Sequence, residues 1–177
     1  MMNRTPAENS DTVSLICALL VRFPEIASIR SMPGQVRLTY AIGKRLDRKS
    51  QAAIGEDIAD HVQSFLRLSG DEGDVEVECE SDRSVTFVHV SRDLQSFSKD
   101  ELVMITGLFA QRFGDTLVRN PDVEEHPDED PQAQDEIVEY AIEALCDPDQ
   151  TKNLVGFREE KRVLVYFLKS RKKAKAS

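Results

Sequence analysis

The sequence contains three pairs of short β-type segments, and a helical segment precedes each pair. The order helix, strand, turn, strand occurs at residues 11–42, 47–90 and 132–168, and a further helix is predicted at 98–113. Helices that connect hairpins usually lie on one face of a mainly antiparallel sheet. The pattern therefore predicts an α+β fold in which three helix-plus-hairpin units share one mainly antiparallel sheet, with the helices packed on one face.

The strands are predicted from a period-two alternation of apolar and polar residues. In residues 35–42, Val36, Leu38 and Tyr40 alternate with polar side chains. In residues 75–80 the alternating polar side chains are all acidic, so this strand is expected to present acids to solvent. These acids are Glu76, Glu78 and Glu80.

The last predicted strand, 162–168, reads RVLVYFL and is apolar at nearly every position. A strand with two apolar faces is usually covered on both sides. We therefore expect this strand near the middle of the sheet or at an interface. The candidate interface residues are Leu164, Tyr166 and Leu168.

The helix at 98–113 has the clearest start signal in the chain. Ser98 and Glu101 have the spacing of a capping box, in which each side chain bonds the backbone N–H of the other residue. Phe97 and Leu102 stand where a hydrophobic staple would close.

The helix predicted at 132–145 has an apolar stripe at helical spacing. We expect Ile137, Tyr140 and Ala141 to point inward, together with Ala144 or Leu145.

The same segments allow a second interpretation, in which residues 35–119 form a ferredoxin-like βαββαβ core with added terminal elements. This interpretation requires a strand at 115–119, where the sequence is DTLVR. The first and third hairpins align without a gap, but almost no aligned residues are identical. Shared secondary structure explains that alignment as well as a duplication does.

The acidic, proline-bearing stretch 121–131 has the composition of a linker, because it contains too few apolar residues to order itself. We expect residues 1–120 to form the main α+β region, with two helix-hairpin units and the helix at 98–113. Residues 132–177 then supply the third unit and a basic tail, and we expect this unit to pack into the same domain.

The net charge of −9 averages over segments of opposite sign. Residues 71–82 and 121–136 carry seven and eight acids and no base. Residues 30–49 carry six bases and one acid, and residues 169–175 carry five bases. Such segregation influences the choice of partner rather than the fold. The candidate contacts to nucleic acid or to an acidic partner are Arg30, Arg37, Lys44, Arg45, Arg48, Lys49, Arg162, Arg171, Lys172 and Lys173.

No catalytic or cofactor-binding motif stands out in the sequence. It has no GxSxG elbow, no glycine-rich phosphate loop and no CxxC pair. His61 lies at the border of a predicted helix, and His126 lies in the acidic stretch. His89 lies in a strand, where Glu76 faces it if residues 82–83 form a two-residue turn. We expect no catalytic residue, no cofactor and no metal site, and we favour a protein that is not an enzyme.

Cys17, Cys79 and Cys146 each lie in an apolar pattern, so we expect buried thiols rather than disulfides or metal ligands. No run approaches the ~20 apolar residues of a membrane-spanning helix. The first residues are polar and lack the apolar centre of a signal peptide. These features predict a cytoplasmic protein without a membrane partner.

Three functions are compatible with these patterns. The first is a non-catalytic protein-interaction or assembly module, in which opposite charges or the apolar last strand join subunits into a homo-oligomer or bind another protein. The second is a nucleic-acid-binding protein that uses the basic first hairpin and the C-terminal tail. The third is a small-ligand regulatory domain, which depends on the ferredoxin-like interpretation.

Overall fold

The computed structural model describes residues 6–119, 131–150, 153–159 and 162–168, and the other residues lie outside the described part of the chain. The elements in chain order are α1 (Pro6–Arg22), β1 (Ser28–Met32), β2 (Gln35–Ile42), α2 (Arg48–Leu68), β3 (Val75–Asp82), β4 (Val85–Asp93), α3 (Lys99–Phe113), the short 3-10 helix η1 (Gly114–Thr116), α4 (Pro131–Leu145), β5 (Asn153–Glu159) and β6 (Arg162–Leu168).

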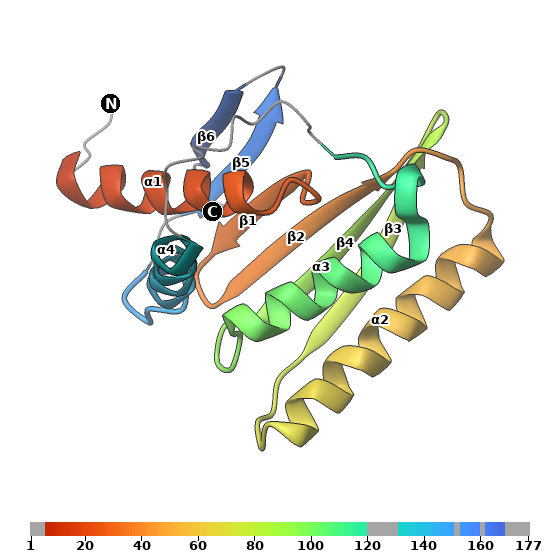
Figure 1. Cartoon of the computed structure of the whole chain (residues 1–177), viewed down its shortest axis with the longest axis horizontal. Coiled ribbons are helices and arrows are strands. Elements are labelled where there is room, and N and C mark those ends of the chain that lie inside the picture. The colour runs from red at the N-terminus through yellow and green to blue at the C-terminus, as the bar shows by residue number, and fades with distance from the viewer. Residues whose placement is uncertain (1–5, 120–130, 151–152, 160–161, 169–177) are drawn as a thin grey trace, which may run out of the picture.

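The six strands of the described chain form one antiparallel sheet in the order β3-β4-β2-β1-β5-β6 (Figure 1). Each hairpin consists of strands that follow one another in the sequence, and the hairpins join through β2 against β4 and β1 against β5. The first hairpin therefore occupies the middle of the sheet. The predicted α+β fold, with three helix-plus-hairpin units on an antiparallel sheet, is confirmed.

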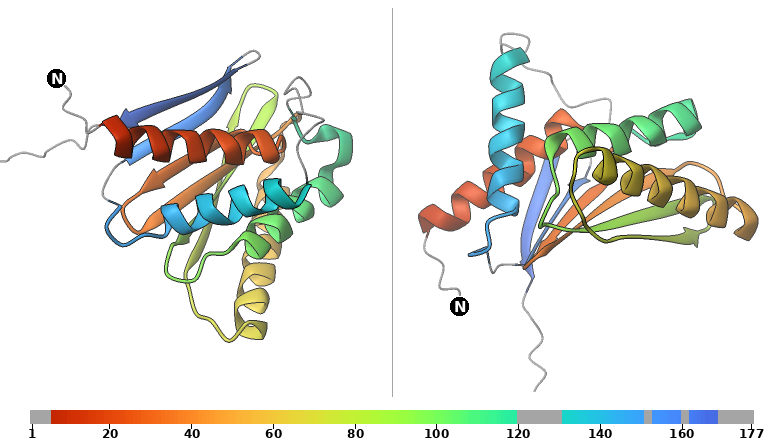
Figure 2. Two further views of the ribbon diagram at one scale, coloured as in Figure 1. Left: turned by 60° about the vertical axis from the view of Figure 1, so that its left-hand side comes forward. Right: turned by 90° about the horizontal axis from the view of Figure 1, so that it is seen from below.

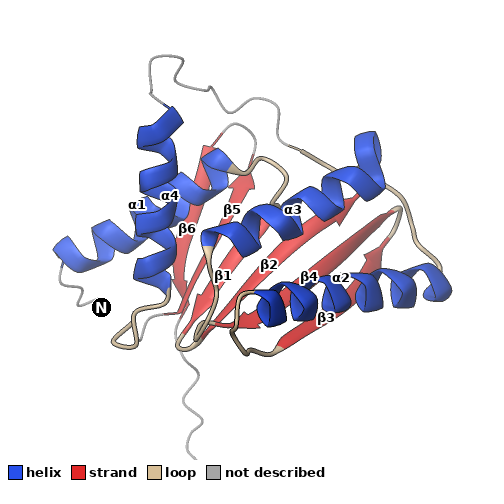
Figure 3. Cartoon of the chain, turned by 60° about the horizontal axis from the view of Figure 1, so that its bottom comes forward, coloured by secondary structure: helices blue, strands red, loops and turns tan. Residues whose placement is uncertain are grey.

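The four α-helices lie over the same face of the sheet, as Figures 2 and 3 show from two directions. α2 lies against β3, whereas α1 lies against β5 and β6. α4 contacts both α1 and α3. The opposite face of the sheet carries no helix among the described residues, and this asymmetry separates the core from the surface that remains open.

The core lies between the helices and the covered face of the sheet. Its most central contact is the Tyr40 ring, which stacks on Phe109 of α3 with 4.0 Å between the ring centroids. The Tyr40 hydroxyl bonds to the Thr106 hydroxyl at 2.9 Å, so its polar end is satisfied although the side chain is fully buried. Burial raises the pKa of Tyr40, and the residue is therefore a neutral core tyrosine.

The third unit packs closely against the first because Gly156 on β5 has no side chain. A Cβ at this position would lie 2.5 Å from Cγ2 of Ile16 and 3.1 Å from Cδ1 of Leu20, both on α1. The absence of a side chain lets α1 approach β5 directly. β1 pairs with β5 in the same region, with Ser28 opposite Phe157.

Arg158 fixes the end of α1 onto β5. Its guanidinium donates hydrogen bonds to the backbone carbonyls of Leu20, Phe23 and Ile26, at 2.8 Å for Phe23. These carbonyls lie at and after the last turn of α1, where backbone C=O groups have no N–H donor within the helix. Burial lowers the pKa of Arg158 to about 10. The Arg158 side chain therefore stabilises the packing of α1 on β5 and does not add to a basic surface.

β6 lies at the edge of the sheet, so its predicted place near the middle was wrong. Its apolar character has a different cause on each face. Val163 and Val165 pack against the core below α1, whereas Tyr166 is 51% exposed on the other face. A pattern that normally indicates a doubly covered strand here belongs to an edge strand.

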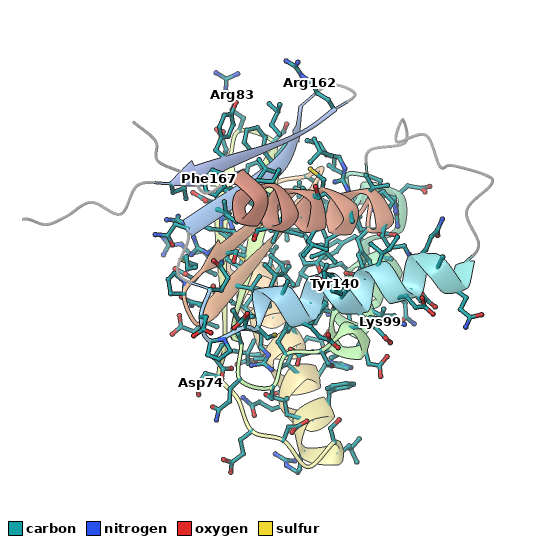
Figure 4. All side chains as sticks on the ribbon, turned by 90° about the vertical axis from the view of Figure 1, so that its left-hand side faces the viewer. Asp74, Arg83, Lys99, Tyr140, Arg162 and Phe167 are labelled. Carbon is teal, nitrogen blue, oxygen red and sulfur yellow. The ribbon has the colours of Figure 1, made fainter. Side chains whose placement is uncertain are left out.

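α4 buries a different stripe from the one expected. Ala141 and Leu145 are buried as predicted, together with Val138 and Ile142. Ile137 and Tyr140 are 42% and 62% exposed, and Figure 4 shows Tyr140 on the outer side of α4. The helix has apolar residues over more than half its circumference, and its contacts with α1 and α3 determine which side is buried.

The start of α3 confirms half of the predicted capping box. The Ser98 hydroxyl accepts a hydrogen bond from the backbone N–H of Glu101 at 3.2 Å, and Phe97 and Leu102 are buried. The Glu101 carboxylate bonds instead to the guanidinium of Arg92 on β4. The Glu101 carboxylate therefore pairs with a buried arginine and not with the backbone N–H of Ser98, as the capping box predicts.

After α3 the chain forms η1, and Leu117 makes a single antiparallel bridge with Ile42. Residues 115–119, which the ferredoxin-like interpretation uses as a strand, contribute only this bridge to the sheet. Most of the predicted linker lies outside the described residues, and Pro131, its last residue, begins α4.

Candidate functional site

The face of the sheet that points away from the four helices, called here the open face, is the main candidate surface. Its residues follow from the alternation along each strand and from the cross-strand registers. It comprises Glu76, Glu78 and Glu80 on β3, Phe87, His89 and Ser91 on β4, Arg37, Thr39 and Ala41 on β2, Ser28 and Arg30 on β1, Val155 and Phe157 on β5, and Leu164, Tyr166 and Leu168 on β6.

The β3 side of the open face is an acid–base network. Glu78 Oε1 pairs with the Arg37 guanidinium at 2.9 Å, and Glu80 Oε1 lies 2.7 Å from His89 Nε2. The other ring nitrogen of His89, Nδ1, lies 2.8 Å from the Thr39 hydroxyl. Two of the acids on this strand are thus paired with side chains of β2 and β4.

The position of His89 corrects the predicted register. The turn of this hairpin consists of residues 83–84, with Arg83 at φ 60°, and Asp82 pairs with Val85. Glu78 therefore lies opposite His89, and Glu76 lies opposite Ser91. The expected pairing of His89 with Glu76 was therefore wrong by two residues along β3, because the turn starts one residue later than assumed.

Arg30 is the open-face cation without a partner. It lies directly opposite Arg37 on β2 and opposite Val155 on β5. Its Nε is shielded from solvent and has no hydrogen-bond partner, and no ion pair joins its guanidinium to another described residue. Buried polar nitrogens usually have a partner, and the Nε of Arg158 is the other exception among the described side chains.

The β5–β6 side of the open face is apolar. Phe157 and Tyr166 form a diagonal pair across the two strands, with 5.7 Å between the ring centroids. Val155 pairs with Tyr166, and Leu164 pairs with Phe157. The open face therefore changes from acidic at β3, through arginine at its centre, to apolar at β6.

The predicted interface residues all lie on the part of the open face that reaches the free edge. Leu164, Tyr166 and Leu168 alternate along β6, and β5 is the strand's only neighbour in the described sheet. One side of the β6 backbone therefore has no strand beside it.

The predicted basic contacts divide into four groups. Lys44, Arg45, Arg48 and Lys49 are exposed where β2 leads into α2, and they lie apart from Arg30 and Arg37 on the open face. Arg162 lies at the same end of the sheet as Arg83, as Figure 4 shows. The tail residues Arg171, Lys172 and Lys173 lie outside the described residues. They follow Leu168, which pairs with Asn153 at the opposite end of the strands.

The residues weighed for catalysis or metal binding are dispersed. His61 is exposed on α2 and lies 3.2 Å from Asp57, one helical turn away, and His126 lies outside the described residues. Among the residues that the structure places, three or more His, Cys, Asp or Glu side chains nowhere gather in a way that could hold a metal ion.

The cysteines are half-buried thiols without disulfide partners. Burial raises the pKa of Cys17 and Cys79, and it raises the pKa of Cys146 to about 11. The Cys146 thiol lies 3.7 Å from the carbonyl oxygen of Phe97. A raised pKa keeps each thiol protonated at neutral pH, which lowers its nucleophilicity.

A search of the described helices for a membrane-spanning segment finds none with the required length and apolar character. No protein-family model matches the chain, and no curated protein or solved structure shows significant similarity to it.

Sequence reasoning overlooked Val155, Phe157 and the unpaired state of Arg30. The alternation in residues 153–157 places Val155 and Phe157 on one face, which was a usable signal. The missing partner of Arg30 had no signal of its own, because it depends on which strands become the neighbours of β1.

Proposed function

We propose that this chain is a protein-interaction module that assembles with a second copy of itself through the free edge of β6. The observation that carries the proposal is an edge strand whose six residues after Arg162 are all apolar or aromatic. An exposed edge of this kind is a template for pairing with another strand. Proteins that remain monomeric usually protect such an edge with inward charges, proline or a bulge.

An antiparallel pairing of two β6 strands centred on Val165 gives the unpaired backbone groups of both edges a partner. Leu164 of one copy then lies opposite Tyr166 of the other, and Val163 lies opposite Phe167. Arg162 lies opposite Leu168, so no two like charges of the strand face each other. This arrangement is isologous and closes as a dimer with one continuous sheet.

The other edge of the sheet is unsuited to the same contact. β3 carries Glu76, Glu78, Glu80 and Asp82 on one face, and pairing with its own copy would bring these acids together. Self-assembly through β6 therefore leaves the acidic edge in solvent.

The bases that flank β6 predict the salt dependence of this dimer. Arg162 precedes the apolar run, and the basic sequence KSRKKAK follows Leu168. Antiparallel pairing brings the start of one strand near the end of the other, so like charges oppose association and salt relieves them. We expect the dimer to strengthen with salt. An assembly held by opposite charges between subunits would weaken.

Sedimentation velocity over a range of protein and salt concentrations tests the proposal. Tyr166→Lys places a charge on the edge strand and is expected to weaken dimerisation at least about tenfold. Tyr140→Lys is the matched control, because Tyr140 is also exposed but lies on α4. Urea unfolding of both variants reports whether the fold is retained.

A wild-type chain that sediments as a monomer at every concentration would refute self-assembly. Equal dimerisation of the two variants would place the contact elsewhere. A dimer that dissociates as salt rises would favour pairing between the oppositely charged regions.

A second candidate function, nucleic-acid binding, is favoured by the exposed bases at one end of the sheet. Lys44, Arg45, Arg48 and Lys49 lie within one short stretch, and Arg45 contacts the backbone of Arg83 in the neighbouring turn at 3.4 Å. A cluster of this kind can neutralise several phosphates. Filter binding at low salt tests it. Retention of an oligonucleotide that persists after all four bases are replaced by Glu would exclude this surface.

A further inference from the structure

We propose that Arg30 and Phe157 form a docking site for an extended segment of a partner protein in which a carboxylate residue is followed, two positions later, by an apolar residue. The carboxylate would bond the Arg30 guanidinium, and the apolar side chain would lie on Phe157 and Val155. This proposal uses the centre of the open face and does not depend on pairing at the β6 edge.

The first support is the unsatisfied guanidinium. Arg30 lies opposite a second arginine, but Arg37 is paired with Glu78 and Arg30 is paired with no described residue. The Nε atom of Arg30 is shielded from solvent, so an incoming carboxylate reaches the terminal guanidinium nitrogens, which bond no described residue. A carboxylate matches the planar fork of the guanidinium and can accept two hydrogen bonds from it.

The second support is the surface beside Arg30. Val155 lies directly opposite Arg30 on β5, and Phe157 lies two residues further along that strand. A diagonal neighbour of this kind is about 7–8 Å away across the strands. Residues i and i+2 of an extended chain point the same way and lie about 6.6 Å apart. One extended segment can therefore reach both Arg30 and Phe157.

A second copy of this chain is a poor occupant of the open face. The centre of the sheet lies between β2 and β1. One centred two-fold packing of two open faces places β3 on β3, so the glutamates of both copies meet. The other places β3 on β6 and β1 on β2, which sets Arg30 over Arg37 and the glutamates over apolar side chains. Both packings bury like charges or unpaired acids.

Nucleic acid also fits less well than an acidic protein segment. A phosphate backbone carries regularly spaced charges, whereas the open face offers one unpaired arginine, and Glu76, Glu78 and Glu80 lie on its far side. An isolated carboxylate beside an apolar residue uses the single cation and the apolar surface without bringing further negative charge toward β3.

The test is a titration of the ¹⁵N-labelled full-length chain with capped peptides of alternating Ala that contain Glu-Ala-Leu. Amide shifts are expected on β1 and β5, together with a shift of the Arg30 Nε–H signal. The Gln-Ala-Leu peptide is expected to bind about tenfold more weakly, because a charge-assisted hydrogen bond is lost. A Glu-Leu peptide with adjacent residues should also bind more weakly, since its side chains point to opposite faces.

Variants of the protein locate the contact. Arg30→Gln is expected to weaken the Glu-Ala-Leu peptide about tenfold and to leave sedimentation unchanged. Arg45→Gln removes the same charge from an exposed loop outside the open face and should bind like the wild type. A folded Arg30→Gln chain, shown by an unchanged amide spectrum elsewhere, makes the comparison valid.

The proposal is overturned if the Glu and Gln peptides bind equally or if Arg30→Gln binds as tightly as wild type. It is also overturned if the shifts gather around Lys44 and Arg45, or if a short oligonucleotide binds the open face more tightly than the peptide. A monomeric wild-type chain that still binds the peptide through Arg30 would refute the β6 dimer while supporting this site.

Discussion

The two faces of the sheet treat arginine in opposite ways. Arg92, on the covered face, is completely buried, and its guanidinium bonds to Glu101 and Ser96. It also bonds to the backbone carbonyls of Asp74, just before β3, and of Asp93, at the end of β4. Arg30, on the open face, lies beside another arginine and has no acceptor among the described residues. The comparison shows that the guanidinium of Arg92 is paired on the covered face, whereas that of Arg30 on the open face bonds no described residue. The Nε atom of Arg158, on the covered face, shares with that of Arg30 the lack of a hydrogen-bond partner.

The largest expected effect comes from breaking the buried pair. Glu101→Ala leaves Arg92 inside the core without its carboxylate, and we expect a loss of about 3–5 kcal/mol in the free energy of unfolding. Urea denaturation measures this loss. Glu143→Ala, which removes an exposed glutamate from α4, is the control and should change stability by less than about 0.5 kcal/mol. Similar losses in both variants would mean that the pair contributes no special stability.

The next effect concerns Arg158, the second arginine of the covered face. Arg158→Ala removes the donor shared by three backbone carbonyls at the end of α1, and we expect a loss of about 2–3 kcal/mol. Hydrogen exchange should show that the amides of the last turn of α1 lose protection more than those of α2. Equal loss of protection in both helices would argue against a local role in fixing α1.

Gly156 tests how closely the helices approach the covered face. Gly156→Ala brings a methyl group against Ile16, and we expect a loss of about 1–2 kcal/mol. Gly107→Ala is the matched control, because nothing lies near its added methyl group on α3. Since alanine favours a helix over glycine, this control should gain up to about 1 kcal/mol. Thermal unfolding of both variants measures whether each substitution raises or lowers stability. A more stable Gly156→Ala variant would contradict the close packing.

The smallest effect is expected on the open face. Arg37 and Glu78 form an ion pair whose side chains are 31% and 62% exposed, so water and salt screen their attraction. A double-mutant cycle with Arg37→Ala and Glu78→Ala should give a coupling energy below about 1 kcal/mol. The same cycle for Arg92 and Glu101 should give several times more. Equal couplings would remove the distinction between the two faces.

Local sequence was sufficient to predict the elements and hairpins. The alternation around Val36, Leu38 and Tyr40 follows from the two-residue repeat of a strand, and the start of α3 follows from the hydroxyl of Ser98. These features depend on residues that are neighbours in the chain, so their physical cause is contained in short stretches of sequence. The acidic outer face of β3 was predictable for the same reason.

Tertiary structure alone decided which hairpins became neighbours and what each ambiguous side chain contacts. The sequence did not predict that β6 lies at the edge of the sheet or that Tyr140 on α4 faces outward. It also did not predict that Glu101 bonds to Arg92 and not to the backbone of Ser98. Each outcome depends on contacts between segments far apart in the chain, such as α1 against Gly156. The unpaired state of Arg30 has the same origin, because strand order set Arg37 and Val155, rather than an acid, beside it.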